Sequence, residues 1–143
     1  SPTTPQGYWT VTAQYGNVDP SFNACSLLTG AGAGFVARAV VTDTKRLDSI
    51  LEEGFKHKGY SFFDVFSNCH INFGRKNKMG EPVLCMNWLK EMVVDKDEYE
   101  TLSPEEKAKK FPIGVLVNTE RPDYCELYQK VREAAQKNAK VSL

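Results

Sequence analysis

Long hydrophobic runs and an excess of one charge are both missing from this chain. No apolar stretch approaches the roughly 20 residues that span a bilayer, so we expect no membrane segment. Eighteen basic side chains balance eighteen acidic ones, whereas nucleic-acid-binding domains usually carry a basic excess. The sequence therefore predicts neither a membrane nor a nucleic acid as partner, and it contains no recognisable signal peptide.

Paired cysteines are also missing. The four cysteines lie far apart and form no Cys-x-x-Cys motif. Small secreted disulfide scaffolds are denser in cysteine than this, so we expect reduced thiols in a cytoplasmic protein. Cys25, Cys85 and Cys125 lie in apolar or helical surroundings, and we predict that all three are packing residues.

The length and composition suit one soluble domain. The chain has 143 residues, of which 41% are hydrophobic and 25% are charged. It begins at Ser1 with residues typical of the middle of a loop, which suggests the later part of a longer polypeptide. Residues 1–20 contain three prolines and two glycines, and this composition predicts a loop or arm.

A strand–helix–strand pattern follows further along. Residues 35–42 and 60–66 are apolar enough for buried strands. Between them an apolar stripe recurs at helical spacing, with Thr42 or Asp43 as the expected cap and Gly59 as the expected end. Short joints make this a βαβ unit with parallel strands and a right-handed crossover. The stripe consists of Leu47, Ile50, Leu51, Gly54 and Phe55.

Other segments predict further helices and strands. Asp19-Pro20 favours a helix start, with Phe22, Cys25 and Leu28 on its inner face. Residues 72–81 read as a polar loop, 88–94 as a helix and 113–117 as a short strand. Ser103-Pro104 and Pro122 favour two more helix starts. The last helix would present one apolar face, made of Tyr124, Leu127, Tyr128, Val131 and Ala135.

The apolar run that begins at Tyr60 ends in a polar turn that carries Cys69. Ligands gather beyond the carboxyl ends of strands in α/β proteins, and thiolates bind iron in iron–sulfur clusters. Cys69 is therefore a candidate cluster ligand whose partners lie outside this chain; the alternative is a small packing residue. The basic residues that follow form either a solvated face or a surface for an acidic electron carrier. These residues are Arg75, Lys76 and Lys78.

Four segments in order resemble one family, the beta subunits of 2-oxoacid:ferredoxin oxidoreductases. The similarity is greatest to the bacterial 2-oxoglutarate:acceptor type, 2-oxoglutarate synthase, and it extends to about residue 120. It implies the carboxyl-terminal half of a thiamine-diphosphate-binding-type α/β fold, with a mainly parallel sheet flanked by helices. The segments are Ser-Pro-Thr-Thr-Pro at 1–5, Tyr-Gly-Asn-Val-Asp-Pro at 15–20, Ala-Gly-Phe-Val-Ala-Arg at 33–38 and Phe-Asp-Val-Phe-Ser-Asn-Cys at 63–69.

The resemblance also implies cofactors. Full-length subunits of this family bind thiamine diphosphate, magnesium and one 4Fe–4S cluster. Cys69 matches the family's last cluster cysteine, with Asn68 where proline is usual, and Thr3 and Thr4 match positions near the thiamine diphosphate pocket. The Gly-Asp-Gly motif and the three early cluster cysteines are absent from these 143 residues. We therefore expect this chain alone to be inactive and to bind none of these cofactors.

The implied activity is oxidative decarboxylation of a 2-oxoacid, with 2-oxoglutarate favoured, to the acyl-CoA. Electrons would pass through the cluster to ferredoxin or a flavodoxin-like acceptor. The implied partners are alpha and other subunits and coenzyme A. The same reaction on pyruvate or branched 2-oxoacids, and a non-catalytic α/β interaction module, stay open as alternatives.

The resemblance divides the chain into three parts. Residues 1–20 would form an arm next to the cofactor pocket, 21–120 the βαβ-containing half of the fold, and 121–143 a carboxyl-terminal helix. A parallel sheet is normally covered on both faces. A chain without its leading strands exposes apolar surface, so we expect it to associate with itself or with the missing half.

Overall fold

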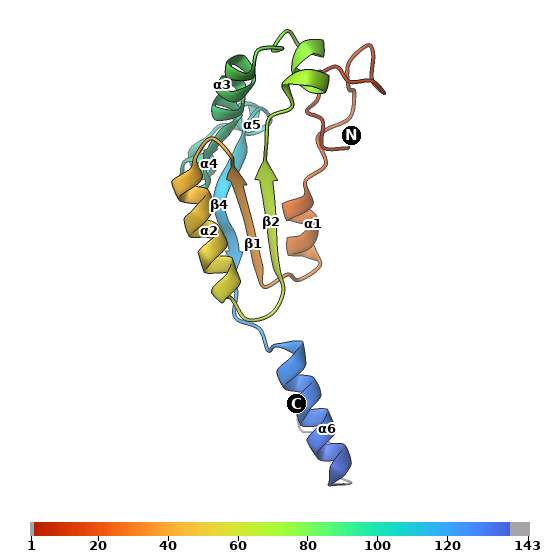
Figure 1. Cartoon of the computed structure of the whole chain (residues 1–143), viewed down its shortest axis with the longest axis vertical. Helices are drawn as coiled ribbons and strands as arrows, with labels where there is room; N and C mark the ends of the chain where they lie inside the picture. The colour runs from red at the N-terminus through yellow and green to blue at the C-terminus, as the bar shows by residue number, and fades with distance from the viewer. Residues whose placement is uncertain (1, 138–143) are drawn as a thin grey trace.

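The computed structural model describes residues 2–137 and places four strands in one mixed sheet of order β2-β1-β4-β3 (Figure 1). The strands are β1 (Phe35–Val40), β2 (Ser61–Phe66), β3 (Val93–Asp95) and β4 (Phe111–Asn118). The helices are α1 (Ala24–Gly30), α2 (Thr44–Lys56), the π-helix η1 (His70–Gly74), α3 (Pro82–Met92), α4 (Lys96–Thr101), α5 (Pro104–Lys107) and α6 (Tyr124–Gln136).

The predicted βαβ unit is confirmed by β1, α2 and β2. The two strands pair in parallel, with Phe35 opposite Ser61 and Val40 opposite Phe66. Asp43 caps α2, because its side chain accepts a hydrogen bond from the Arg46 backbone N–H. The helix ends at Lys56, three residues before the predicted stop.

Two of the three strand pairings are parallel, which confirms an α/β fold with a mainly parallel sheet. β3 pairs in parallel with β4. β4, however, lies antiparallel to β1, with Phe35 opposite Asn118. These partners are far apart in sequence, so local patterns did not reveal this pairing.

The core is centred on β1, whose six residues are all buried. Phe35, Ala37 and Ala39 pack with Ile50 of α2 on one face of the sheet. Val36 packs with Cys25 and Ala33, beside α1, on the other face. The middle of the sheet is therefore covered on both sides, as its continuous apolar sequence predicts.

The predicted start of the first helix was wrong. α1 begins at Ala24, because the Asn23 side chain accepts from the Ser26 N–H and caps the helix there. Phe22 lies outside the helix, and its backbone N–H donates to the Pro2 carbonyl at 2.8 Å. Its side chain is 48% exposed and does not share the inner face with Cys25.

The helix predicted over 88–94 was misplaced at both ends. α3 begins at Pro82 and ends at Met92. Val93 and Val94 instead enter β3, where they pair with Phe111 and Pro112. Tertiary pairing with β4 thus overrides a helical pattern that was continuous in sequence.

The last helix begins at Tyr124, two residues after the predicted start at Pro122. Asp123 caps α6 by accepting from the Glu126 N–H. None of the residues of α6 is buried, and the helix projects beyond the end of the sheet (Figure 1). Cys125 is therefore exposed, which contradicts its predicted packing role.

No helix in residues 2–137 combines the length and apolar character that a bilayer crossing needs.

Candidate functional site

A cleft of about 370 Å³ lies at the carboxyl end of β2. Thr3 and Pro5 of the arm line one part of it, Ser67 and Cys69 of the β2–η1 turn another, and Trp88 of α3 a third. In Figure 1 the arm and η1 lie at the same end of the molecule, opposite α6. The structure thus brings Thr3 and Cys69, two of the three predicted site residues, into one cleft.

Thr4, the third predicted site residue, does not line this cleft. It is only 7% exposed, and its backbone carbonyl accepts from the Asn17 side-chain amide at 2.9 Å. The neighbouring Thr3 carbonyl accepts from the Ser21 hydroxyl at 2.8 Å. These bonds fold the arm back on itself, so that the two threonines occupy different surroundings.

Cys69 is exposed and directly precedes η1. The predicted polar loop therefore begins as a π-helical turn, in which the Gly74 N–H donates to the Cys69 carbonyl at 2.8 Å. The backbone N–H groups of Phe73, Asn72 and Ile71 lower the pKa of the Cys69 thiol, because they stabilise the negatively charged sulfur. A lowered pKa favours the thiolate that metals bind.

An ion pair beside the cleft joins three parts of the fold. Arg38 of β1 is 2% exposed, and its Nε donates to Asp64 of β2 at 2.9 Å. Its Nη2 donates to the Asn23 side chain at 2.8 Å. The guanidinium also lies over the rings of Phe66 and Phe111, at 5.1 and 5.6 Å from their centroids. Phe66 and Phe111 line the cleft together with Asp64, so this network holds the cleft wall in place.

The sequence analysis did not predict this network. The available signal was one arginine in an otherwise apolar strand, since a buried charge requires a partner. The partner, Asp64, lies 26 positions further along, and only the parallel register of β1 and β2 places it opposite Arg38.

Two of the three cysteines predicted to pack do so. Cys85 is fully buried, and Cys25 is 2% exposed. Burial raises the pKa of the Cys25 thiol to about 11, and its sulfur donates to Asp64 at 3.7 Å. Cys25 is therefore a neutral thiol.

An aromatic group ties the arm to the far wall of the cleft. Trp88 Nε1 donates to the Tyr8 hydroxyl at 2.6 Å. The ring centroids of Phe73 and Trp88 are 4.9 Å apart, and those of Tyr8 and Phe73 are 5.3 Å apart. Asn77 adds two hydrogen bonds to this contact. Its Oδ1 accepts from the Trp9 backbone N–H, and its Nδ2 donates to the Trp9 carbonyl.

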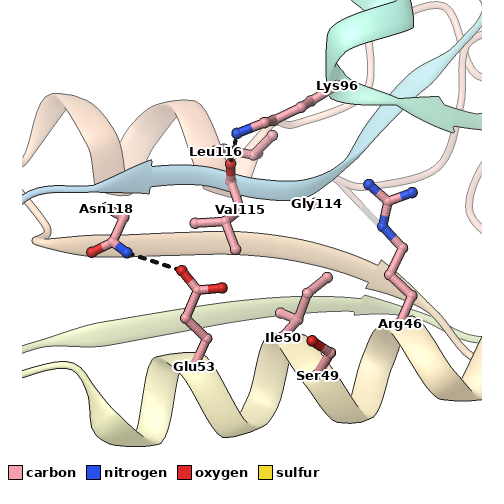
Figure 2. Close-up of a pocket in the computed structure, with 9 residues that line it drawn as sticks. All are labelled: Arg46, Ser49, Ile50, Glu53, Lys96, Gly114, Val115, Leu116 and Asn118. Carbon is pink, nitrogen blue, oxygen red and sulfur yellow. Dashed lines mark hydrogen bonds between the residues drawn. The ribbon is translucent and has the colours of Figure 1, made fainter.

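A second, more polar cleft of about 550 Å³ lies between α2 and β4 (Figure 2). Lys96 donates to the Val115 carbonyl at 2.7 Å, and Arg46 donates to the Ile113 carbonyl at 3.2 Å. A Cβ on Gly114 would lie 3.0 Å from Arg46 Nη2, so glycine leaves room for this approach. Both side chains therefore donate to carbonyls of β4, and Lys96 does so beyond the stretch that pairs with β3.

The residues described here do not form a complete metal site. No group of three potential His, Cys, Asp or Glu ligands occurs between residues 2 and 137. Cys69 can supply one thiolate at the rim of the cleft, and the other ligands of a four-cysteine cluster would have to come from elsewhere.

Comparison with known proteins identifies the relatives, although no family model matches the sequence. The KorB subunit of 2-oxoglutarate synthase from Methanothermobacter marburgensis is 35% identical over 138 residues, which is 96% of this chain and 48% of that protein. The KorB subunit from Methanocaldococcus jannaschii is 32% identical over 93% of this chain and 49% of its own length. This chain is a homologue of KorB.

A solved structure shares the fold. It is a 2-oxoglutarate:ferredoxin oxidoreductase from Magnetococcus marinus, with 2-oxoglutarate, coenzyme A and succinyl-CoA bound. The TM-score is 0.71 at 21% sequence identity, over 100% of this chain and 48% of that chain. The KorB homologue thus spans about half the length of the relatives that it matches.

Proposed function

We propose that this chain forms part of the beta subunit of a 2-oxoacid oxidoreductase that acts on 2-oxoglutarate. The observation that carries the proposal is similarity to KorB subunits over more than nine-tenths of the chain. The relatives are named as subunits, so other subunits of the same enzyme are the expected partners. The product would be the acyl-CoA, and ferredoxin or a flavodoxin-like protein would accept the electrons.

Cys69 is proposed as one ligand of a 4Fe–4S cluster in the complete subunit. Its exposure, its place at a strand end and its lowered pKa fit a thiolate ligand. When bound, such a cluster carries single electrons to the acceptor. The exposed Arg75 and Lys76 follow η1 directly, and they would present positive charge to an acidic electron carrier near this end of the molecule.

Thr3 is proposed as a neighbour of thiamine diphosphate and magnesium. It lies in the same cleft as Cys69, and this proximity supports the proposal that the two cofactors bind near each other. Thiamine diphosphate supplies the electron sink for decarboxylation when it is bound. The aromatic wall formed by Phe73 and Trp88 would exclude water beside it. Thr4 would act only through the fold of the arm, because its side chain is buried.

The decisive experiment replaces Cys69 with alanine in the complete subunit, purified without oxygen. We expect loss of the cluster's visible absorbance and a fall in protein-bound iron and acid-labile sulfide. Cys125→Ala is the matched control, because Cys125 is also exposed but lies on α6. It should leave iron and sulfide unchanged.

An unchanged iron and sulfide content in Cys69→Ala would reject Cys69 as a ligand. The choice of substrate is tested separately, with the assembled enzyme and equal concentrations of 2-oxoglutarate, pyruvate and a branched 2-oxoacid. A higher kcat/KM for either of the latter two would reject 2-oxoglutarate as the preferred substrate, without affecting the assignment of Cys69.

A further inference from the structure

α6 carries an apolar stripe that the described part of the chain leaves largely exposed. Tyr124 is 73% exposed, Tyr128 53% and Val131 40%. Lys58 and Glu126 form a salt bridge at 3.0 Å between the helix and the segment that precedes β2, and both side chains face solvent. A helix of 13 residues is marginal in water without tertiary contacts. The stripe therefore needs a partner.

The spacing of the stripe indicates that the partner is another helix. Tyr124, Leu127, Val131 and Ala134 follow one another at intervals of three, four and three residues. This is the repeat that places side chains along the seam of a helix pair.

The sizes of these four side chains favour a second copy of α6 in the opposite direction. In that arrangement the bulky Tyr124 faces the small Ala134 of the other copy, and Leu127 faces Val131. Alternating large and small residues across a seam fills it evenly. A parallel pair would instead place tyrosine against tyrosine and alanine against alanine, which leaves one layer crowded and another empty.

The charges along the helix are complementary in the same arrangement. The first half of α6, taken with the four residues before it (120–128), holds three acidic side chains and one basic side chain. The second half, taken with Lys137 after it (129–137), holds three basic side chains and one acidic one. Such a distribution also stabilises the helix itself through its dipole. In an antiparallel pair it sets each acidic half against a basic half, and in a parallel pair it sets like charges together.

We propose that two copies of this chain associate through α6 in an antiparallel helix pair. The interface involves about three turns of each helix, and the area that it buries is well below the roughly 1,200 Å² of a standard interface. The dimer is therefore weak, and it forms only in the upper part of the micromolar range or above. The pair leaves the cleft at Cys69 free, because α6 lies at the opposite end of the molecule (Figure 1).

Analytical ultracentrifugation of the 143-residue chain over micromolar to millimolar concentrations tests the dimer. Wild type should show a reversible monomer–dimer equilibrium. Val131→Lys should weaken association at least tenfold, because it places a charge in the seam. Gln129→Lys is the matched control, since it adds the same charge to an exposed position on the opposite side of α6, and it should change association less than twofold.

Cross-linking tests the direction of the pair. In a background with Cys69→Ser and Cys125→Ser, chains carrying Tyr124→Cys are mixed with chains carrying Ala134→Cys and oxidised. The mixed disulfide should form several-fold faster than the Tyr124→Cys homodimer. Faster formation of that homodimer would overturn the antiparallel arrangement.

Two other results would overturn the proposal. The first is a chain that stays monomeric over the whole concentration range, as expected if α6 instead docks on another subunit. The second is a dimer that Val131→Lys leaves intact, since association would then use a strand edge. A circular dichroism melt of each variant confirms that it is folded.

Discussion

α2 and α6 make an instructive comparison, because they have the same length and the same amphipathic character but different surroundings. Each has 13 residues, an aspartate N-cap and one apolar stripe. α2 lies on the sheet, and Ile50 and Gly54 are buried there. α6 lies beyond the sheet and buries none of its residues. An amphipathic pattern therefore predicts that a helix has a face to cover, but it does not say which surface covers it.

The largest expected effect comes from Ile50→Ala. Ile50 is 5% exposed and packs with Phe35, Ala37 and Ala39, so the cavity should lower the free energy of unfolding by about 3 kcal/mol. Urea denaturation at equilibrium measures this change. Val131→Ala on α6 is the control, and it should cost less than about 0.5 kcal/mol. Equal losses in the two variants would contradict the contrast between the helices.

Gly54→Ala should have the next largest effect. A Cβ at this position would lie 2.3 Å from Phe63 Cζ and 2.7 Å from Phe35 Cε1, both in the core beneath α2. Overpacking should outweigh the gain in helix propensity and destabilise the chain by roughly 1–2 kcal/mol. Thermal unfolding followed by circular dichroism measures it. A more stable variant would show that the two rings can move apart freely.

Removal of the N-cap side chains of α2 and α6 should have smaller effects on stability than the two core substitutions. Asp43→Ala removes the cap of α2 and should cost about 1 kcal/mol of global stability, because α2 unfolds with the core. Asp123→Ala removes the equivalent cap of α6 and should reduce the helical signal without moving the main transition. Far-ultraviolet circular dichroism combined with urea denaturation separates the two results. A shift of the main transition in Asp123→Ala would mean that α6 is coupled to the core.

The smallest expected effect concerns the salt bridge between Arg46 of α2 and Asp95 of β3. The Asp97 backbone N–H, and then Arg46, lower the pKa of Asp95 below its ordinary 3.8. A depressed pKa contributes stability above pH 3.8 that is lost as the pH falls through the lower folded-state value. The contribution should be under about 1 kcal/mol, because both side chains are partly exposed.

Urea denaturation between neutral pH and pH 2 measures that contribution. Asp95→Asn should show a flatter decline in stability at the acidic end than wild type. Parallel curves for the two proteins would mean that Asp95 contributes nothing in this range.

Residues close in sequence were predicted well. The βαβ unit followed from apolar runs and one helical stripe. Ser103 was recognised as a cap from its own neighbours, and Asp43 was one of two adjacent candidates for the cap of α2. Cys69 was singled out because a strand ends just before it. Its place as a cluster ligand stays a prediction that the Cys69→Ala experiment tests. The place of Thr3 beside thiamine diphosphate stays a prediction as well.

Residues that meet across the fold were not predicted. The pairing of Arg38 with Asp64 depends on the register of two strands, and the burial of Thr4 depends on how the arm folds back. Val93 and Val94 of β3 were predicted to be helical, because their pairing with β4 depends on residues far away in the sequence.

The sequence by itself determined the βαβ unit and the cap at Ser103, because propensity, periodicity and capping act between residues a few positions apart. Only the tertiary structure decided that β4 runs antiparallel to β1, that Thr3 shares a cleft with Cys69, and that α6 is left uncovered. These outcomes depend on which surfaces compete to be buried, and that competition takes place between segments far apart in the chain.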